Sequence, residues 1–513
     1  MCEHGTPLPD DPDLCHEIIR QQAETIGELQ RRVEQLEHQV EILLRRQFGP
    51  RRESVDPDQL RLFSDDAPED VAEGNGEELP ESEDARPKRR WRRAGRQRLP
   101  EGLPRKRVEY ELTDDELPCP DCGCTRTKIG EEVSEQLEYV PSSLFVIQHA
   151  RFRYACRACQ EHVAIADKPP QPIDKGLPGP GLLAQTITSK YSDHLPLYRL
   201  EDIFARHGVE LSRATLCGWM ASCADLLTPL YDLMVKRVLL SIVIHTDDTT
   251  VPVFDPTLPK TRTGRFWDYI GDVRHPYVVY DYTPRRTRDG PERFLKGYRG
   301  YLQADAFSGY DHMCAGRDVT EVACWAHVRR KFFESRTSSP VLAHAALARI
   351  RQLYKIETVA EEFSAEDRRA LRQRDSVPLL RAFGEWLTEQ KRLALPKSPI
   401  GQAIAYARSN WTALCRYPEH GELSIDNNLA ERMLRAQAIG RRNWTFLGSD
   451  RGGRTAAILY SFTGTCKHHD VDPFAYLSDV LRRLPSHPEE QLDELLPDVW
   501  FTSHPSARRK KAA

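Results

Sequence analysis

The sequence has no apolar run that approaches the roughly 20 residues needed by a membrane-spanning helix. Its first residues, MCEHGTPLPDDPDLC, lack the charged and then apolar pattern of a secretory signal. The sequence also lacks a Walker phosphate loop, a Gly-x-Ser-x-Gly elbow and a dinucleotide-binding fingerprint. We therefore expect a cytoplasmic chain with no membrane partner, whose chemistry depends on none of these three motifs.

An excess of charge of either sign is also missing, but this average conceals a segregation. The chain has 73 Lys and Arg against 77 Asp and Glu, for a formal net charge of −4. Residues 64–84 contain ten acidic residues and no basic ones, whereas residues 86–107 contain eleven basic residues and one acid. Such blocks stay extended, so we predict a charged, disordered linker over 49–107. The near-neutral total is thus no argument against a nucleic-acid partner.

The 13 cysteines are odd in number and mostly scattered, which does not favour a disulfide framework. Two Cys-x-x-Cys pairs stand apart, Cys119 with Cys122 and Cys156 with Cys159. Four thiolates suit tetrahedral zinc, and a site closed by four protein ligands is structural rather than catalytic. We predict a zinc ribbon over 108–167, with strands joining the two pairs; Cys124 is a less favoured substitute ligand.

Two helical segments flank this unit. Residues 14–48 carry an apolar heptad seam interrupted by Gln22, which indicates a coiled coil and self-association, or else one amphipathic helix packed on its own protein. Residues 181–236 read as a helix, a turn at Gly208 and a second helix opened by Ser212. This spacing resembles a helix-turn-helix with Arg213 near the start of the recognition helix, although any helical hairpin can look this way.

From residue 237 onward, short β-rich runs alternate with helices, which predicts a mixed α/β sheet over 237–467. Residues 338–424 are mostly helical and interrupt the sheet. The last part, 468–513, reads as a C-terminal element that ends in a basic tail.

Acidic residues follow the apolar strands of this α/β region. Asp247 and Asp248 come directly after SIVIHT, and Asp305 ends GYLQA. Carboxylates on neighbouring strands form a hard oxygen site that suits magnesium or manganese. Glu431, near the start of a predicted helix, is the candidate third acid, although it could equally pair with a neighbouring arginine. The stretch 429–454 has six Arg against two acids, a surface suited to a phosphate backbone.

Several long motifs in order resemble the insertion sequence 66 family of bacterial transposases across nearly the whole chain. They include CPDCGC, EQLEYVP, YACRAC, HTDDTTVPV, GRFWDYIGD, QADAFSGY, CWAHVRRKFF, IDNNLAERMLR and GRRNWTFLGSDRGG. The resemblance implies a ribonuclease-H-like core with a helical insertion and an Asp-Asp-Glu triad. By motif position the triad is Asp247, Asp305 and Glu431; the family usually has Glu where this chain has Asp248.

The resemblance further implies cleavage and strand transfer at the ends of an insertion sequence, by two-metal phosphoryl transfer with Mg²⁺ or Mn²⁺. Its partners would be double-stranded DNA and small companion proteins of the same element, and its place the bacterial nucleoid. We expect DNA contacts from Arg213, Arg435, Arg441 and Arg442. His327 and Arg330 lie in a family motif but receive no firm role. The alternatives are a non-catalytic zinc-ribbon DNA-binding protein and a metal-independent hydrolase with paired carboxylates.

Overall fold

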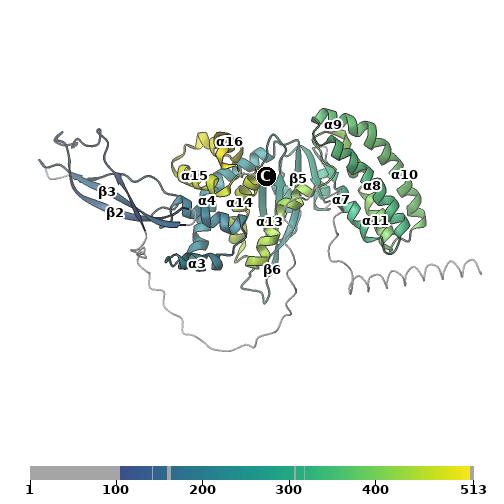
Figure 1. Cartoon of the computed structure of the whole chain (residues 1–513), viewed down its shortest axis with the longest axis horizontal. Coiled ribbons are helices and arrows are strands. Elements are labelled where there is room, and N and C mark those ends of the chain that lie inside the picture. Colours follow the sequence, from purple (N-terminus) through teal and green to yellow (C-terminus); the bar gives the residue numbers. More distant parts are fainter. Residues whose placement is uncertain (1–103, 141–142, 159–162, 306–307, 317, 509–513) are drawn as a thin grey trace, which may run out of the picture.

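The computed structural model describes residues 104–508 except 141–142, 159–162, 306–307 and 317. The expected coiled coil over 14–48, nearly all of the expected linker, Cys159 and the end of the basic tail lie outside the described residues. Figure 1 shows an elongated molecule with a long hairpin at one end, a mixed sheet in the middle and a bundle of helices at the other end. Within the described part, no helix combines the length and apolarity that a membrane span requires.

The hairpin consists of β2 (Thr127–Val140) and β3 (Ser143–Ala155), which pair in antiparallel register. β1 (Arg105–Tyr110) pairs with β3 in parallel, and the short β4 (Ala164–Ile165) pairs with its other end. The strands expected between the two cysteine pairs are therefore present. Because β1 begins at Arg105, the last three residues of the expected disordered linker belong to a strand; pairing with β3 orders them.

A helical segment joins the hairpin to the sheet. It contains α2 (Pro180–Ile187), the π-helix η2 (Thr188–Ser192), α3 (Leu197–Arg206) and α4 (Arg213–Val238). Gly208, with φ +78°, makes the turn between α3 and α4, and the Ser212 side chain accepts a hydrogen bond from Thr215 N at the start of α4. The predicted helix–turn–helix spacing is thus present, and α4 continues through Pro229 to Val238.

The central sheet has five strands in the order β7-β6-β5-β8-β9. These are β5 (Val243–Val253), β6 (Arg262–Ile270), β7 (Val278–Thr283), β8 (Gly300–Ala304) and β9 (Val319–Ala323). β5, β6 and β7 are antiparallel neighbours, whereas β8 and β9 run parallel to β5. The mixed sheet is as expected, except that the two β-rich runs around Asp247 form one continuous strand.

Helices pack on the sheet and bury its apolar residues. α13 (Asn428–Trp444) lies along β5 and β6, while α14 (Asp450–His468) and α4 lie against β7. Buried side chains of the sheet, of these helices and of the C-terminal helices α15 (Pro473–Arg483) and α16 (Pro497–Ser503) form one core. The shorter helices of this part are α5 (Asp289–Phe294) and α6 (Asp311–Cys314).

The helical insertion, residues 338–424, forms the bundle at the end opposite the hairpin (Figure 1). It contains α8 (Pro340–Ala360), α9 (Ala365–Leu371), α10 (Val377–Leu393), α11 (Pro399–Ser409) and the one-turn α12 (Trp411–Leu414). It has its own apolar core, in which Phe383 and Trp411 pack against Trp325 of α7 (Trp325–Glu334). The backbone N–H of Trp325 donates to Ile425 O at 3.1 Å. The chain therefore enters and leaves the insertion at the same place, and we call this pair of residues the neck.

Candidate active site

Asp247 lies on β5 on the face of the sheet that α13 covers. In the antiparallel register it stands opposite Asp268 of β6, and Asp268 stands opposite Tyr280 of β7, so the three share a face. Tyr280 donates through its hydroxyl to Met433 O of α13 at 2.6 Å. Met433 is two residues beyond Glu431, so α13 places its first turn on the same side of the sheet as Asp247.

Asp248 points to the opposite face, because successive side chains of a strand alternate. Its carboxylate is almost fully buried, with 2% of the side chain exposed. Two arginines neutralise it: Arg265 Nη1 donates to Oδ2 at 2.6 Å and Arg286 Nη2 donates to Oδ1 at 2.7 Å. A carboxylate engaged by two guanidinium groups is poorly available to a metal ion, so of the two neighbours Asp247 is the better candidate ligand.

Asp305 directly follows β8, the parallel neighbour of β5, and Glu431 lies in the first turn of α13. Burial and the negative charges of Asp305, Asp248 and Glu431 raise the pKa of Asp247 to about 7. The structure therefore brings the three predicted acids, Asp247, Asp305 and Glu431, close enough to repel one another electrostatically. We call them the acid site. An acid whose pKa is raised by like charges is a recurring mark of a functional centre.

Glu431 meets two side chains of α7. Its Oε1 lies 3.6 Å from His327 Nε2, and its Oε2 lies 3.6 Å from Arg330 Nη2. Both distances exceed a hydrogen bond, and Glu431 Oε1 is a buried oxygen that makes none. Burial lowers the pKa of His327, which favours the neutral ring. A buried carboxylate oxygen with no donor fits a cation, so the acid site suits the divalent metal that the sequence implies.

The acid site is wider than the ligand shell of a single ion. Among the described residues, the groups of three ligand atoms that lie within 4.8 Å of one another include a cysteine cluster and not the three acids. Two ions about 3.5–4 Å apart would need a wider spacing of carboxylates than one ion does. In this geometry the three acids do not form a closed ligand shell for one ion.

Two residues attach α13 to β5 on either side of Glu431. Asn427 is fully buried, and its side chain bonds His245 Nδ1 at 3.1 Å and donates to Thr246 O at 2.8 Å. Arg441, near the other end of α13, donates to Thr249 Oγ1 and to the hydroxyl and carbonyl oxygens of Thr250. β8 pairs with β5 only as far as His245. The contacts from α13 therefore cover the edge of β5 beyond His245, where β8 no longer pairs with it.

The cysteine cluster lies at the far end of the hairpin. The sulfurs of Cys119, Cys122 and Cys156 all lie within 4.8 Å of one another, and those of Cys122 and Cys156 are 3.0 Å apart. Gly123, with φ +68°, donates to Cys119 O and makes the tight turn of the first pair. Three converging thiols match the predicted zinc site. Cys124 is not among the three, and Cys159 lies outside the described residues.

The arginines expected at DNA differ in their surroundings. Arg213, Arg435 and Arg442 are exposed, and Arg213 occupies the first turn of α4 as predicted. Arg441 is half-buried against β5, and its guanidinium donates hydrogen bonds to that strand. Contact with DNA remains a prediction for all four, but for Arg441 the structure shows a positioning role as well.

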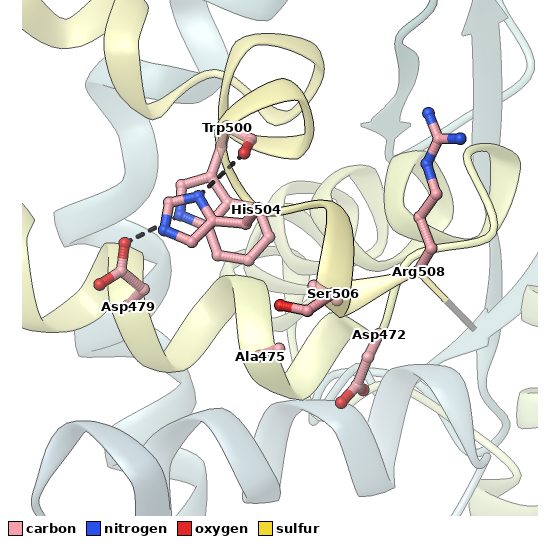
Figure 2. Close-up of a pocket in the computed structure, with 8 residues that line it drawn as sticks. Asp472, Ala475, Asp479, Trp500, His504, Ser506 and Arg508 are labelled. Carbon is pink, nitrogen blue, oxygen red and sulfur yellow. Dashed lines mark hydrogen bonds between the residues drawn. The ribbon is translucent and has the colours of Figure 1, made fainter. Parts of the chain in front are cut away.

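A separate pocket lies in the C-terminal element (Figure 2). The ring of His504 stacks on Trp500, with centroids 4.1 Å apart, and Trp500 Nε1 donates to Asp479 Oδ2 at 2.8 Å. Asp472, Ser506 and Arg508 complete most of its wall. The sequence had singled out none of these residues. The stacking and hydrogen bonds within the pocket explain why the rings of Trp500 and His504 lie where they do.

Several residues of the acid site were missed or left without a role by sequence reasoning. Asp268, Arg265 and Arg286 had no signal beyond their presence in or near recognisable motifs. Asn427 could be expected only as a cap of the helix with Glu431, and not as a residue that bonds β5. His327 stood in the motif CWAHVRRKFF, and its spacing after β9 gave no hint that it would reach Glu431. Such contacts depend on how α7 and α13 meet at the neck, which local sequence patterns do not encode.

Comparisons with known proteins agree with this architecture. The model of the Transposase IS66 family matches residues 175–455, which include all three acids. Models of the zinc-finger binding domain of transposase IS66, the IS66 C-terminal element and the Transposase C of IS166 homeodomain match residues 116–160, 461–497 and 35–108. The chain therefore belongs to the IS66 family of transposases.

Relatives occur in Sinorhizobium fredii. The uncharacterized protein y4jD is 33% identical over 509 residues, which cover 95% of this chain and 98% of the relative. The uncharacterized protein y4hP is 35% identical over 433 residues, covering 80% of this chain and 77% of the relative. The uncharacterized protein y4qI is 34% identical over 489 residues, covering 91% and 89%.

Proposed function

We propose that this chain is an active DNA transposase that cleaves the ends of its insertion sequence and joins them to target DNA at the acid site. The observation that carries the proposal is the meeting of Asp247, Asp305 and Glu431 at one end of a mixed sheet, within the span that the transposase model matches. The mixed sheet, with acids on neighbouring strands and a helical insertion before the third acid, supports a ribonuclease-H-like core.

Each acid has a distinct place in this scheme. Asp247 and Asp305 offer oxygens from neighbouring parallel strands, and Glu431 offers its buried Oε1 from α13. Bound Mg²⁺ or Mn²⁺ would activate the attacking hydroxyl and stabilise the leaving oxygen. Asp268 of β6 supports the site, since its Oδ1 accepts a hydrogen bond from Asp247 N at 2.9 Å. The exposed arginines of α13 would hold the phosphate backbone.

Three substitutions test the acid site: Asp247→Asn, Asp305→Asn and Glu431→Gln. Each removes a charge and keeps the shape of the side chain, so each should lower strand cleavage by more than about 100-fold, because even residues that only support metal ligands are worth 10–100-fold. Binding to DNA that carries the element's ends should persist. The measurement is nicking of labelled end DNA by the purified full-length chain in Mg²⁺ or Mn²⁺.

The matched control is Arg293→Gln, which breaks the ion pair with Asp281 elsewhere in the same domain. Its cleavage should stay close to that of the wild-type chain. Cleavage that survives removal of divalent metal would contradict the mechanism. Tight binding of the end DNA by the wild-type chain without any cleavage would favour a non-catalytic DNA-binding protein derived from a transposase.

A further inference from the structure

His327 occupies a fourth corner of the acid site. It lies in the first turn of α7, directly after β9, and so at the same end of the sheet as Asp305, which follows β8. Its ring is mostly buried, with 23% of the side chain exposed, and both Glu431 and Asp305 act on it electrostatically. Histidine at this corner therefore faces the same space as the acids.

Two buried atoms of this corner make no hydrogen bond. These are Oε1 of Glu431 and Nδ1 of His327. Buried polar atoms are nearly always paired, so a concentration of such atoms at one place indicates that something else satisfies them. Glu431 Oε1 faces the ring through Nε2, and Nδ1 lies on the other side of the same ring. The unpaired oxygen between two side chains of metal-binding types is therefore the atom that indicates an ion here.

The separation of the facing atoms is close to that of two ligands on one ion. His327 Nε2 and Glu431 Oε1 are 3.6 Å apart. Two atoms bound at about 2.1 Å to the same octahedral ion lie roughly 3 Å apart, so a small rotation of either side chain would suffice. Glu431 Oε2 lies 3.6 Å from Arg330, which leaves Oε1 as the oxygen directed toward the ring.

We propose that His327 is a ligand of the metal ion held by Glu431, so that the site offers one nitrogen beside its carboxylates. The inference rests on the proposed function, because it places His327 on an ion of the acid site. A nitrogen ligand favours Mn²⁺ over Mg²⁺ relative to an all-oxygen shell. The chain should therefore bind Mn²⁺ more tightly than Mg²⁺, and part of this preference should depend on His327.

The test uses the purified full-length chain loaded with Mn²⁺ and measured by electron spin-echo modulation. The wild-type spectrum should show modulation from a directly bound histidine nitrogen, and His327→Ala should remove it. Titration by electron paramagnetic resonance should show that His327→Ala lowers the affinity for the Mn²⁺ ion held by Glu431 by about tenfold or more. Neither readout requires DNA or turnover.

Two further variants separate a ligand from a brace. His327→Gln retains an amide that can donate to Glu431 but has no ring nitrogen, so it would rescue a brace, whereas the nitrogen modulation of a ligand should be lost in it. The control is His312→Ala. His312 lies at an exposed position 3.6 Å from Glu292, so the pair has the same separation as His327 and Glu431 but lies outside the acid site. The nitrogen modulation of this variant should equal that of the wild-type chain. Circular dichroism confirms that each variant is folded.

The outcomes distinguish the two levels of the proposal. Nitrogen modulation that persists in His327→Ala would overturn the assignment of His327 while leaving the acid site in place. A wild-type chain that binds Mn²⁺ through the three acids without nitrogen modulation would do the same. A wild-type chain that binds no Mn²⁺ would overturn both the ligand and the proposed function.

Discussion

Asp247 and Asp248 are adjacent in the chain, yet their carboxylates have different surroundings. Asp247 faces α13, and its burial, together with the charges of neighbouring acids, raises its pKa to about 7. Asp248 faces away and is held between Arg265 and Arg286. Adjacent side chains of a strand point to opposite faces. One of these two neighbouring carboxylates therefore lies among other acids, whereas the other is neutralised by arginines. This contrast explains why we count Asp247, and not Asp248, among the residues of the acid site.

Lys190 shows the same dependence on surroundings for a cation. It lies in the π-helix η2, with its Nζ 5.4 Å from the ring centroid of Tyr191 and 5.7 Å from that of Trp444. Burial lowers the pKa of Lys190 to about 8. Folding thus favours the neutral amine relative to an unfolded chain, in which the pKa is about 10.5. The cost of burying the charge is fully present below pH 8 and disappears as the pH rises toward 10.5.

Replacement of Lys190 should therefore change the pH dependence of stability. We expect the free energy of unfolding of Lys190→Met to exceed that of the wild-type chain at pH 7, by at most about 3.5 kcal/mol at 1.4 kcal/mol per pKa unit. The difference should shrink between pH 8 and 10.5. Urea unfolding across this range measures it. Lys331→Met, at an exposed lysine over Tyr406, should show no such trend.

At the scale of elements, α13 connects the site to the sheet. Its first residues are fixed to β5 by Asn427 and its last turn by Arg441, with Glu431 between them. After α13 the chain continues along β5, where Leu447 N donates to Pro252 O and Phe254 N donates to Leu447 O. The helix that carries the third acid is thus held along its length.

Asn427 is the point at which this attachment can be tested. We expect Asn427→Ala to lower the free energy of unfolding by about 1–3 kcal/mol, because it leaves buried groups of His245 and Thr246 without their hydrogen bonds. Cleavage should fall as well, since Glu431 lies one turn further along the helix. Thermal unfolding and the nicking assay measure the two effects.

The comparison variant is Asn410→Ala, at a less buried asparagine whose amide donates to Tyr406 O. It should leave cleavage unchanged. Unaltered stability and cleavage in Asn427→Ala would show that the packing of α13 alone fixes Glu431.

The sequence was most informative where a feature is local. The first Cys-x-x-Cys pair, the Ser212 cap and the start of the helix with Glu431 all follow from residues a few positions apart, and the structure has each in place. The continuous strand through Asp247 was missed, because two acids within an apolar run resemble a break. The contact of His327 with Glu431 joins residues about a hundred positions apart, so neither periodicity nor capping could reveal it.

At the scale of the whole molecule, the zinc-finger hairpin and the sheet are connected through α2. Leu182 N at the start of α2 donates to Glu138 Oε1 of β2 at 3.0 Å, and Leu137 N donates to Leu177 O at 2.6 Å. The thiol cluster lies at the opposite end of the hairpin from these contacts (Figure 1). Loss of zinc should thus loosen the distal end first.

We expect Cys156→Ser to remove the zinc without unfolding the sheet. Metal analysis should show about one zinc per wild-type chain and none in the variant, because a site of this kind needs all its thiolates. Limited proteolysis should cut first within the zinc-binding segment. Cys223→Ser, at a buried cysteine of α4 outside the cluster, should retain zinc. A variant that retains zinc would contradict the assignment of Cys156.

The neck between Trp325 and Ile425 has a consequence for the order in which the chain is synthesised and folded. A ribosome makes Asp247 and Asp305 well before Glu431, and the intervening helical insertion must close on itself before the chain can return to the sheet. Contacts that join such distant parts of a chain form late in folding. Chains that end early carry an incomplete set of acids. A potentially damaging activity toward DNA would therefore be confined to chains that have been synthesised and folded almost to the end.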